Sequence, residues 1–144
     1  KGTVVLSGGG ATTLTAADSG AVCVFDTVGA STFTLPSPEV GMKFTFISAV
    51  TATGDHEIIA GTDGHGFLGG VGSFGTTLAE GGDAFSANAN GQDDYITMTG
   101  GTSGGIAGTY IVVVGILGTS AAKSWAVGGY VLSVGTAVTP FATS

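Results

Sequence analysis

The chain lacks arginine altogether and has three lysines against ten acidic residues, for a formal net charge of −7 over 144 residues. Neutralising nucleic-acid phosphates takes clustered lysine or arginine, so direct nucleic-acid binding is disfavoured. The same shortage disfavours binding to an anionic membrane surface. Without arginine the chain also has none of the bidentate carboxylate and phosphate clamps that many enzymes use.

Cysteine and long hydrophobic runs are equally scarce. Cys23 is the single cysteine, so the chain forms no internal disulfide. Its neighbours Val22 and Val24 predict a small buried hydrophobic side chain rather than a reactive thiol. The longest dense apolar run, Tyr110 to Leu117 (YIVVVGIL), is far shorter than the roughly 20 residues that a membrane-spanning helix needs. We interpret this run as a buried strand and expect no membrane partner.

Histidine is scarce too, and the two histidines do not form a convincing metal site. His56 and His65 stand near the acidic residues Asp55, Glu57 and Asp63. Adjacent residues on a strand point to opposite faces, so Asp55, His56 and Glu57 cannot all bind one ion from a regular strand. The sequence therefore predicts solvated turn residues here and no metal.

No catalytic set is visible either. Asp83, Asp93 and Asp94 could offer oxygen ligands to calcium, but their spacing does not match an EF-hand loop. The segment GVGSF at 70–74 lacks the final glycine of a nucleophile elbow. We therefore expect no enzymatic activity, no catalytic residue and no cofactor.

What the chain does have is glycine and apolar residues in alternation. Its 28 glycines are too scattered for collagen and too mixed with valine, phenylalanine and threonine for a disordered linker, which indicates many turns in a β protein. Charged residues make up 9% of the chain, against about 25% in ordinary soluble domains, so much of the surface must be uncharged.

Periodicity predicts an all-β fold. Met42, Phe44 and Phe46 alternate with Lys43 and Thr45, which is typical of a half-buried strand, and no segment keeps a helical period over eleven residues. The strands expected over 21–25 and 31–35 are predicted to pair as a hairpin. We expect one domain over residues 1–144, an antiparallel β-sandwich or jelly-roll-like fold with long glycine-rich loops, and an N-terminal arm over residues 1–13.

Five residues are candidates for an interface. We interpret Gly61 to Gly75 as a long glycine-dense loop whose apolar residues dock onto the body of the protein or onto a neighbouring subunit. A lone tryptophan in an apolar strand is typical of a core or a subunit interface, although Trp125 beside Lys123 could also stack on a ligand. The candidate interface residues are Phe67, Leu68, Val71, Phe74 and Trp125.

Two segments carry a resemblance to a known family. The first runs from Leu14 to Phe46, with Leu14, Thr15, Asp18, Ser19 and Gly20, then Thr34, Leu35 and Pro36, then Gly41, Phe44 and Phe46. The second has Asp94, Tyr95 and Ile96, followed by Lys123, Ser124, Trp125, Ala126, Val127 and Gly129. Together they resemble capsid decoration (cement) proteins of tailed phages, and similar modules in phage tail fibres.

The resemblance implies a structural, non-enzymatic virion protein on the outer surface of the capsid. Such a protein would be a homotrimer that bridges neighbouring major capsid proteins and stabilises the phage head. The alternative is a tail-fibre or tailspike module that binds a host receptor or glycan, and a third reading is a bacterial carbohydrate-binding domain. Fibre modules usually continue into long repetitive or coiled-coil segments, so their absence favours decoration.

Overall fold

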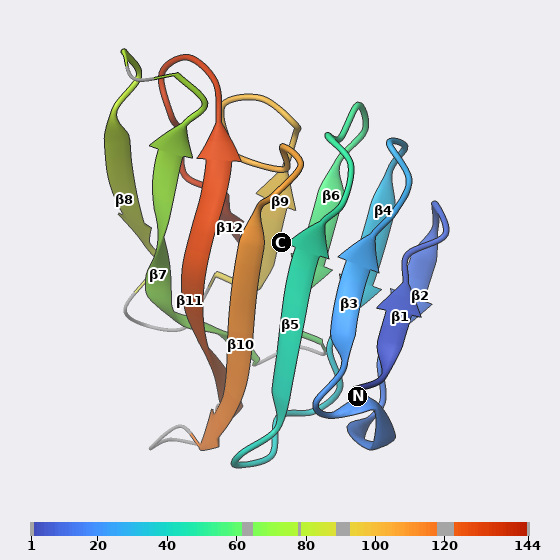
Figure 1. Cartoon of the computed structure of the whole chain (residues 1–144). Coiled ribbons are helices and arrows are strands. Elements are labelled where there is room, and N and C mark those ends of the chain that lie inside the picture. Colours follow the sequence, from blue (N-terminus) through green and yellow to red (C-terminus); the bar gives the residue numbers. More distant parts are fainter. Residues whose placement is uncertain (1, 62–64, 78, 89–92, 118–122, 144) are drawn as a thin grey trace.

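The computed structural model describes residues 2–61, 65–77, 79–88, 93–117 and 123–143. It confirms an all-β fold in which two sheets pack face to face (Figure 1). In the described part of the chain the helical structure is one short 3₁₀ turn, η1 (Ala16–Asp18). The carboxylate of Asp18 accepts bonds from the backbone N–H and the hydroxyl of Thr15, both at 2.8 Å, and these bonds lower its pKa.

In the part of the chain that the structure describes, sheet A, in front in Figure 1, has seven strands and sheet B, behind it, has five. The order in sheet A is β1 (Val4–Leu6), β3 (Val22–Phe25), β5 (Lys43–Ser48), β10 (Tyr110–Leu117), β11 (Lys123–Ser133), β7 (Gly66–Gly75) and β8 (Gly82–Ser86). The order in sheet B is β12 (Phe141–Ala142), β9 (Tyr95–Met98), β6 (His56–Ile59), β4 (Ser31–Thr34) and β2 (Ala11–Thr13).

The first six strands alternate between the sheets, so the chain winds as a flattened coil. β1, β3 and β5 pair in parallel in sheet A, and β2, β4 and β6 pair in parallel in sheet B. The expected β-sandwich is confirmed, but its strands are not all antiparallel, because both sheets are mixed. Parallel neighbours need a crossover connection, and here the strand in the opposite sheet provides it.

The predicted hairpin is also wrong, because β3 and β4 lie in different sheets. The turn over 26–30 crosses from sheet A to sheet B, and Phe25 and Phe33 meet edge to face between the sheets with ring centroids 5.1 Å apart. Both strands bury alternate residues, as hairpin strands would, so their periodicity could not separate the two arrangements. Likewise, much of residues 4–13 forms the edge strands β1 and β2 rather than an arm.

The expected loop over 61–75 contains the ten-residue strand β7, which pairs in parallel with β11 and antiparallel with β8. Two of its glycines lie too close to a neighbouring strand for any side chain. Gly69 has a φ of 106°, and a Cβ there would meet the carbonyl oxygen of Val127 within 3.0 Å. A Cβ at Gly70 would collide with the carbonyl oxygen of Phe85. The glycines that indicated a loop thus permit close strand contact.

Aromatic side chains fill the space between the sheets. Phe44 and Phe46 are buried, as the alternation in β5 predicted, and Phe46 lies 5.5 Å from Phe33 between ring centroids. Trp125 is fully buried against Phe44, and its Nε1 donates a hydrogen bond of 3.2 Å to the carbonyl oxygen of Ala60. This bond ties β11 to the chain just after β6 in the opposite sheet.

Cys23 lies in this core with no exposed surface, as predicted, and burial raises the pKa of its thiol to about 12. The unfolded chain releases the thiol proton near 9.0, whereas the folded chain keeps it to about 12. The free energy of unfolding should therefore fall as the pH rises from about 9 toward 12.

Chemical denaturation from pH 8 to pH 11 measures this slope, with Cys23→Ala as the control that removes this contribution. Thiol reagents should modify Cys23 only in denaturant. Rapid labelling of the native protein at pH 8 would contradict the buried thiol.

Candidate functional site

The outer face of sheet A is apolar. Along its strands the residues that alternate with the buried core are mostly valine, leucine, isoleucine, tyrosine and phenylalanine. In a sheet with one face on the core, the other face is normally polar. We call this surface the sheet-A face and define it by Val4, Leu6, Val22, Val24, Ile47, Phe74, Tyr110, Val112, Val114, Tyr130 and Leu132.

Strand register aligns these side chains into rows across the sheet. One row runs from Leu6 through Val24, Ile47 and Tyr110 to Tyr130, each paired with the next. It then continues over Gly72 and Ala84 on β7 and β8. Five adjacent strands therefore present a large apolar residue at the same level, which makes the surface continuous rather than a scatter of single residues.

An aromatic cluster lies on three neighbouring strands of this face, where β10 begins and where β11 and β7 approach their ends. The rings of Tyr110 and Tyr130 are stacked with centroids 6.0 Å apart, and Phe74 meets Tyr130 edge to face at 5.8 Å. Exposure is 51% for Phe74, 37% for Tyr110 and 38% for Tyr130. Large, partly exposed aromatic side chains are the type that dominates the binding energy of protein interfaces.

The outer face of sheet B is more polar, although the paired residues Ile59 and Tyr95 also point outward there. Its outward positions include Thr13, Thr32, Thr34 and Thr97, with Glu57 among them. Partial burial raises the pKa of the Glu57 carboxyl, and the nearby charge of Asp55 raises it further. Threonine and glutamate suit a solvated sheet surface, so the two outer faces of this sandwich are not equivalent.

The five candidate interface residues do not lie on one surface. Phe67, Val71 and Trp125 are buried in the core, so these side chains are not on the surface of the folded chain. Leu68 is half-buried, and Phe74 belongs to the sheet-A face.

Sequence reasoning missed Tyr110 and Tyr130, although a signal was present. The run Tyr110 to Leu117 is apolar at even-numbered and odd-numbered positions alike, and we interpreted it as a buried strand. In the structure one face of this strand packs on the core, so Ile111 and Val113 are buried, whereas Tyr110 on the other face is exposed.

His56 is not the solvated turn residue that the sequence predicted. It has no exposed surface, and its ring stacks on Phe25 with centroids 4.5 Å apart and an interplanar angle of 7°. Its Nε2 lies 2.8 Å from the carbonyl oxygen of Thr27, and a carbonyl only accepts, so Nε2 carries the proton. The buried Nδ1 has no hydrogen-bond partner.

Among the described residues no group of three or more His, Cys, Asp or Glu could hold a metal ion, and Asp63 lies outside those residues.

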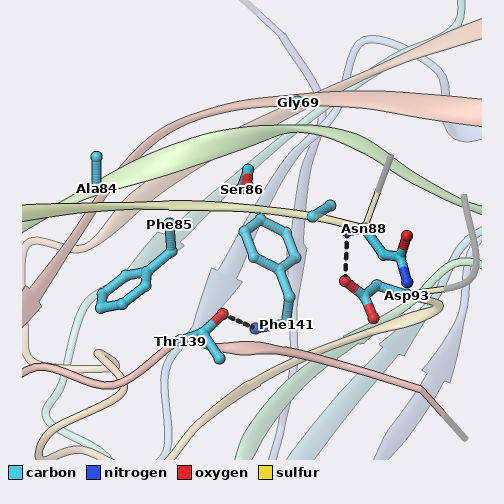
Figure 2. A pocket seen from close by; sticks show the side chains of 9 residues that line it. Gly69, Ala84, Phe85, Ser86, Asn88, Asp93, Thr139 and Phe141 are labelled. Carbon is cyan, nitrogen blue, oxygen red and sulfur yellow. Dashed lines mark hydrogen bonds between the residues drawn. The ribbon is translucent and has the colours of Figure 1, made fainter. Parts of the chain in front are cut away.

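An open groove of about 810 Å³ lies between β8 and the C-terminal segment. In Figure 2 the side chain of Phe85 points from β8 toward that segment, and the ring of Phe141 points back toward β8. Asp93 accepts a bond of 2.6 Å from the backbone N–H of Asn88 and one of 3.1 Å from the hydroxyl of Thr143. Both carboxylate oxygens of Asp93 thus accept hydrogen bonds from nearby segments of the chain. Among the described residues, the groove does not bring together a nucleophile, a base and an acid.

The chain matches no protein-family model, no curated protein and no solved structure. In the described ranges, no helix has the length and apolar character needed to cross a bilayer. The function is therefore inferred from the geometry of the chain itself and from the resemblance of its two segments.

Proposed function

We propose that this chain is a structural virion protein, a decoration protein that binds the outer surface of a phage capsid and stabilises it. The observation that carries the proposal is the sheet-A face, which is apolar across neighbouring strands and carries an aromatic cluster on β10, β11 and β7. A surface of this kind is typical of a protein that works in an assembly. The resemblance of Leu14–Phe46 and the Trp125 strand to decoration proteins supports a phage capsid as that assembly.

The mechanism in this proposal is mechanical. The chain would act as a homotrimer that lies across joints between major capsid proteins and adds buried area to a lattice that closes without it. Few charged groups would lose their hydration in such contacts, because charged residues make up only 9% of the chain. No bond is made or broken, so the activity needs no cofactor.

The proposal predicts that capsids without this protein assemble but lose packaged DNA on heating or osmotic shock. The test compares heat release of DNA from particles with and without the protein, and re-adding purified protein should restore retention. Adsorption to host cells is the control and should not change. Unchanged DNA retention together with a loss of adsorption would refute the decoration function and favour a tail-fibre module.

The groove supports a second candidate function, binding of a host glycan as in a tail-fibre module. Phe85 and Phe141 offer apolar contact there, and Ser86, Asn88 and Thr139 offer polar groups. Concave sites with a few polar groups on an apolar lining are the usual form of small-ligand sites. Titrating host-surface oligosaccharides into the labelled protein tests this by NMR: shifts confined to the groove would support glycan binding, and no shift would exclude it for the sugars used.

A further inference from the structure

We propose that a second copy of this chain covers the sheet-A face, with Tyr130, Tyr110 and Phe74 at the centre of the contact. The inference rests on the proposed function in one respect, since it takes this face to be an assembly surface. It goes further by naming the occupant and the residues that carry the contact. The argument uses the area of the face, its charge and the position of its aromatic cluster.

The area suits a stable contact between two copies. Seven strands with spacings of about 4.8 Å span roughly 29 Å. Along β10 the outward residues from Tyr110 to Ile116 span roughly 20 Å at about 3.4 Å per residue. The product is roughly 600 Å², close to the 800 Å² or so that each partner contributes to a standard interface.

Charge favours a second copy on this face rather than elsewhere. Each chain carries a formal charge of −7, so two copies repel unless their acidic groups stay apart. None of the eleven residues that define the sheet-A face carries a carboxylate, and the exposed Lys43 pairs with Val114 on that face. The outer face of sheet B, in contrast, would bring Glu57 toward the partner.

The aromatic cluster places three large side chains on neighbouring strands of the face. Tyr110 is on β10, the middle strand of sheet A, and Tyr130 and Phe74 follow on the next two strands. Tyrosine combines a large apolar ring with a hydroxyl that can bond across an interface. Ile47 pairs with Tyr110 and Leu132 pairs with Phe74, so apolar residues adjoin the cluster. A twofold arrangement would stack two sheets about 10 Å apart, and a threefold one would turn the face of each copy toward the axis. Tyr130 is buried in both.

Sedimentation of the purified full chain over a range of concentrations tests the proposal, with Tyr130→Asp as the disrupting variant. We expect the wild type to form an oligomer and the variant to weaken its association by roughly thirtyfold or more. The matched control is Thr34→Asp, which adds the same charge on the outer face of sheet B and should leave the oligomer intact. Circular dichroism of each variant checks that the sheets are unchanged.

A second variant, Tyr130→Cys, keeps the proposal falsifiable if an aspartate disturbs folding. The new thiol should be protected from maleimide at concentrations where the oligomer forms and should react on dilution, while Thr34→Cys should react at both. Cys23 is buried and gives no background.

Three outcomes decide the inference, and the first and third also separate it from the proposed function. A wild-type chain that stays monomeric at all concentrations but still binds capsids would overturn the inference and leave the decoration function standing. An oligomer that survives Tyr130→Asp but dissociates with Thr34→Asp would overturn it too, because the contact would then use sheet B. An oligomer that depends on Tyr130 but binds no capsid would support the inference and count against the decoration function.

Discussion

Replacing Trp125 by alanine should lower the free energy of unfolding by about 3–5 kcal/mol, the range for removing a large aromatic side chain from a packed core. The ring has no exposed surface and contacts Phe44, with ring centroids 5.8 Å apart. The substitution leaves a cavity between the sheets, and it also removes the hydrogen bond to the carbonyl oxygen of Ala60. A domain with ordinary marginal stability would lose a large part of its free energy of unfolding.

Urea denaturation followed by circular dichroism measures this effect. Trp125→Phe is the matched control, since it keeps most of the apolar volume and loses the Nε1 donor, so its cost should be clearly smaller than that of alanine. Equal costs would mean that the hydrogen bond to Ala60, and not the packing, accounts for the role of Trp125. A cost below about 1 kcal/mol for Trp125→Ala would contradict its placement in the core.

The adjacent glycines Gly128 and Gly129 of β11 should differ strongly in how much the same substitution destabilises the protein. Gly129 has a φ of 112°, and a Cβ there would collide with the carbonyl oxygen of Tyr110 on the paired strand. Gly129→Ala should therefore cost roughly 2–5 kcal/mol, from backbone strain together with a steric clash that the strand ladder prevents from relaxing. At Gly128 a Cβ would meet nothing within 4 Å, so Gly128→Ala should change the free energy of unfolding by less than about 1 kcal/mol.

Thermal and urea unfolding of the two variants provide the comparison. The pair is well matched, because the same methyl group is added one residue apart in one strand. If Gly128→Ala proved the more damaging variant, the register of β11 against β10 would be off by one residue.

Most strands could be predicted from local pattern, because each buries alternate side chains whatever its partner. The alternation in β5 gave the correct face for Met42, Phe44 and Phe46. It could not reveal that β3 and β4 belong to different sheets, since pairing depends on contacts between distant parts of the chain. β7 was missed for a different reason: its glycines have low strand propensity, and only the approach of Val127 and Phe85 shows why they are there.

The candidate site was predicted less well than the fold. Of the residues expected at an interface, Phe74 lies in the aromatic cluster, whereas Phe67 and Trp125 lie in the core. An apolar side chain in a strand can face either the core or a partner, and its identity does not decide between them. The sheet-A face emerges only when register places Leu6, Tyr110 and Tyr130 in one row.

The coiled order of the first six strands has a consequence for folding during synthesis. β1 to β6 pair with strands one winding away, so this half of the protein can form its parallel contacts as it leaves the ribosome. β7 can meet β8 at once, but its other edge pairs with β11, which is made only after β8, β9 and β10. Until then Phe67 has no Trp125 beside it, and the nascent chain carries an open sheet edge of the kind that can pair with another chain.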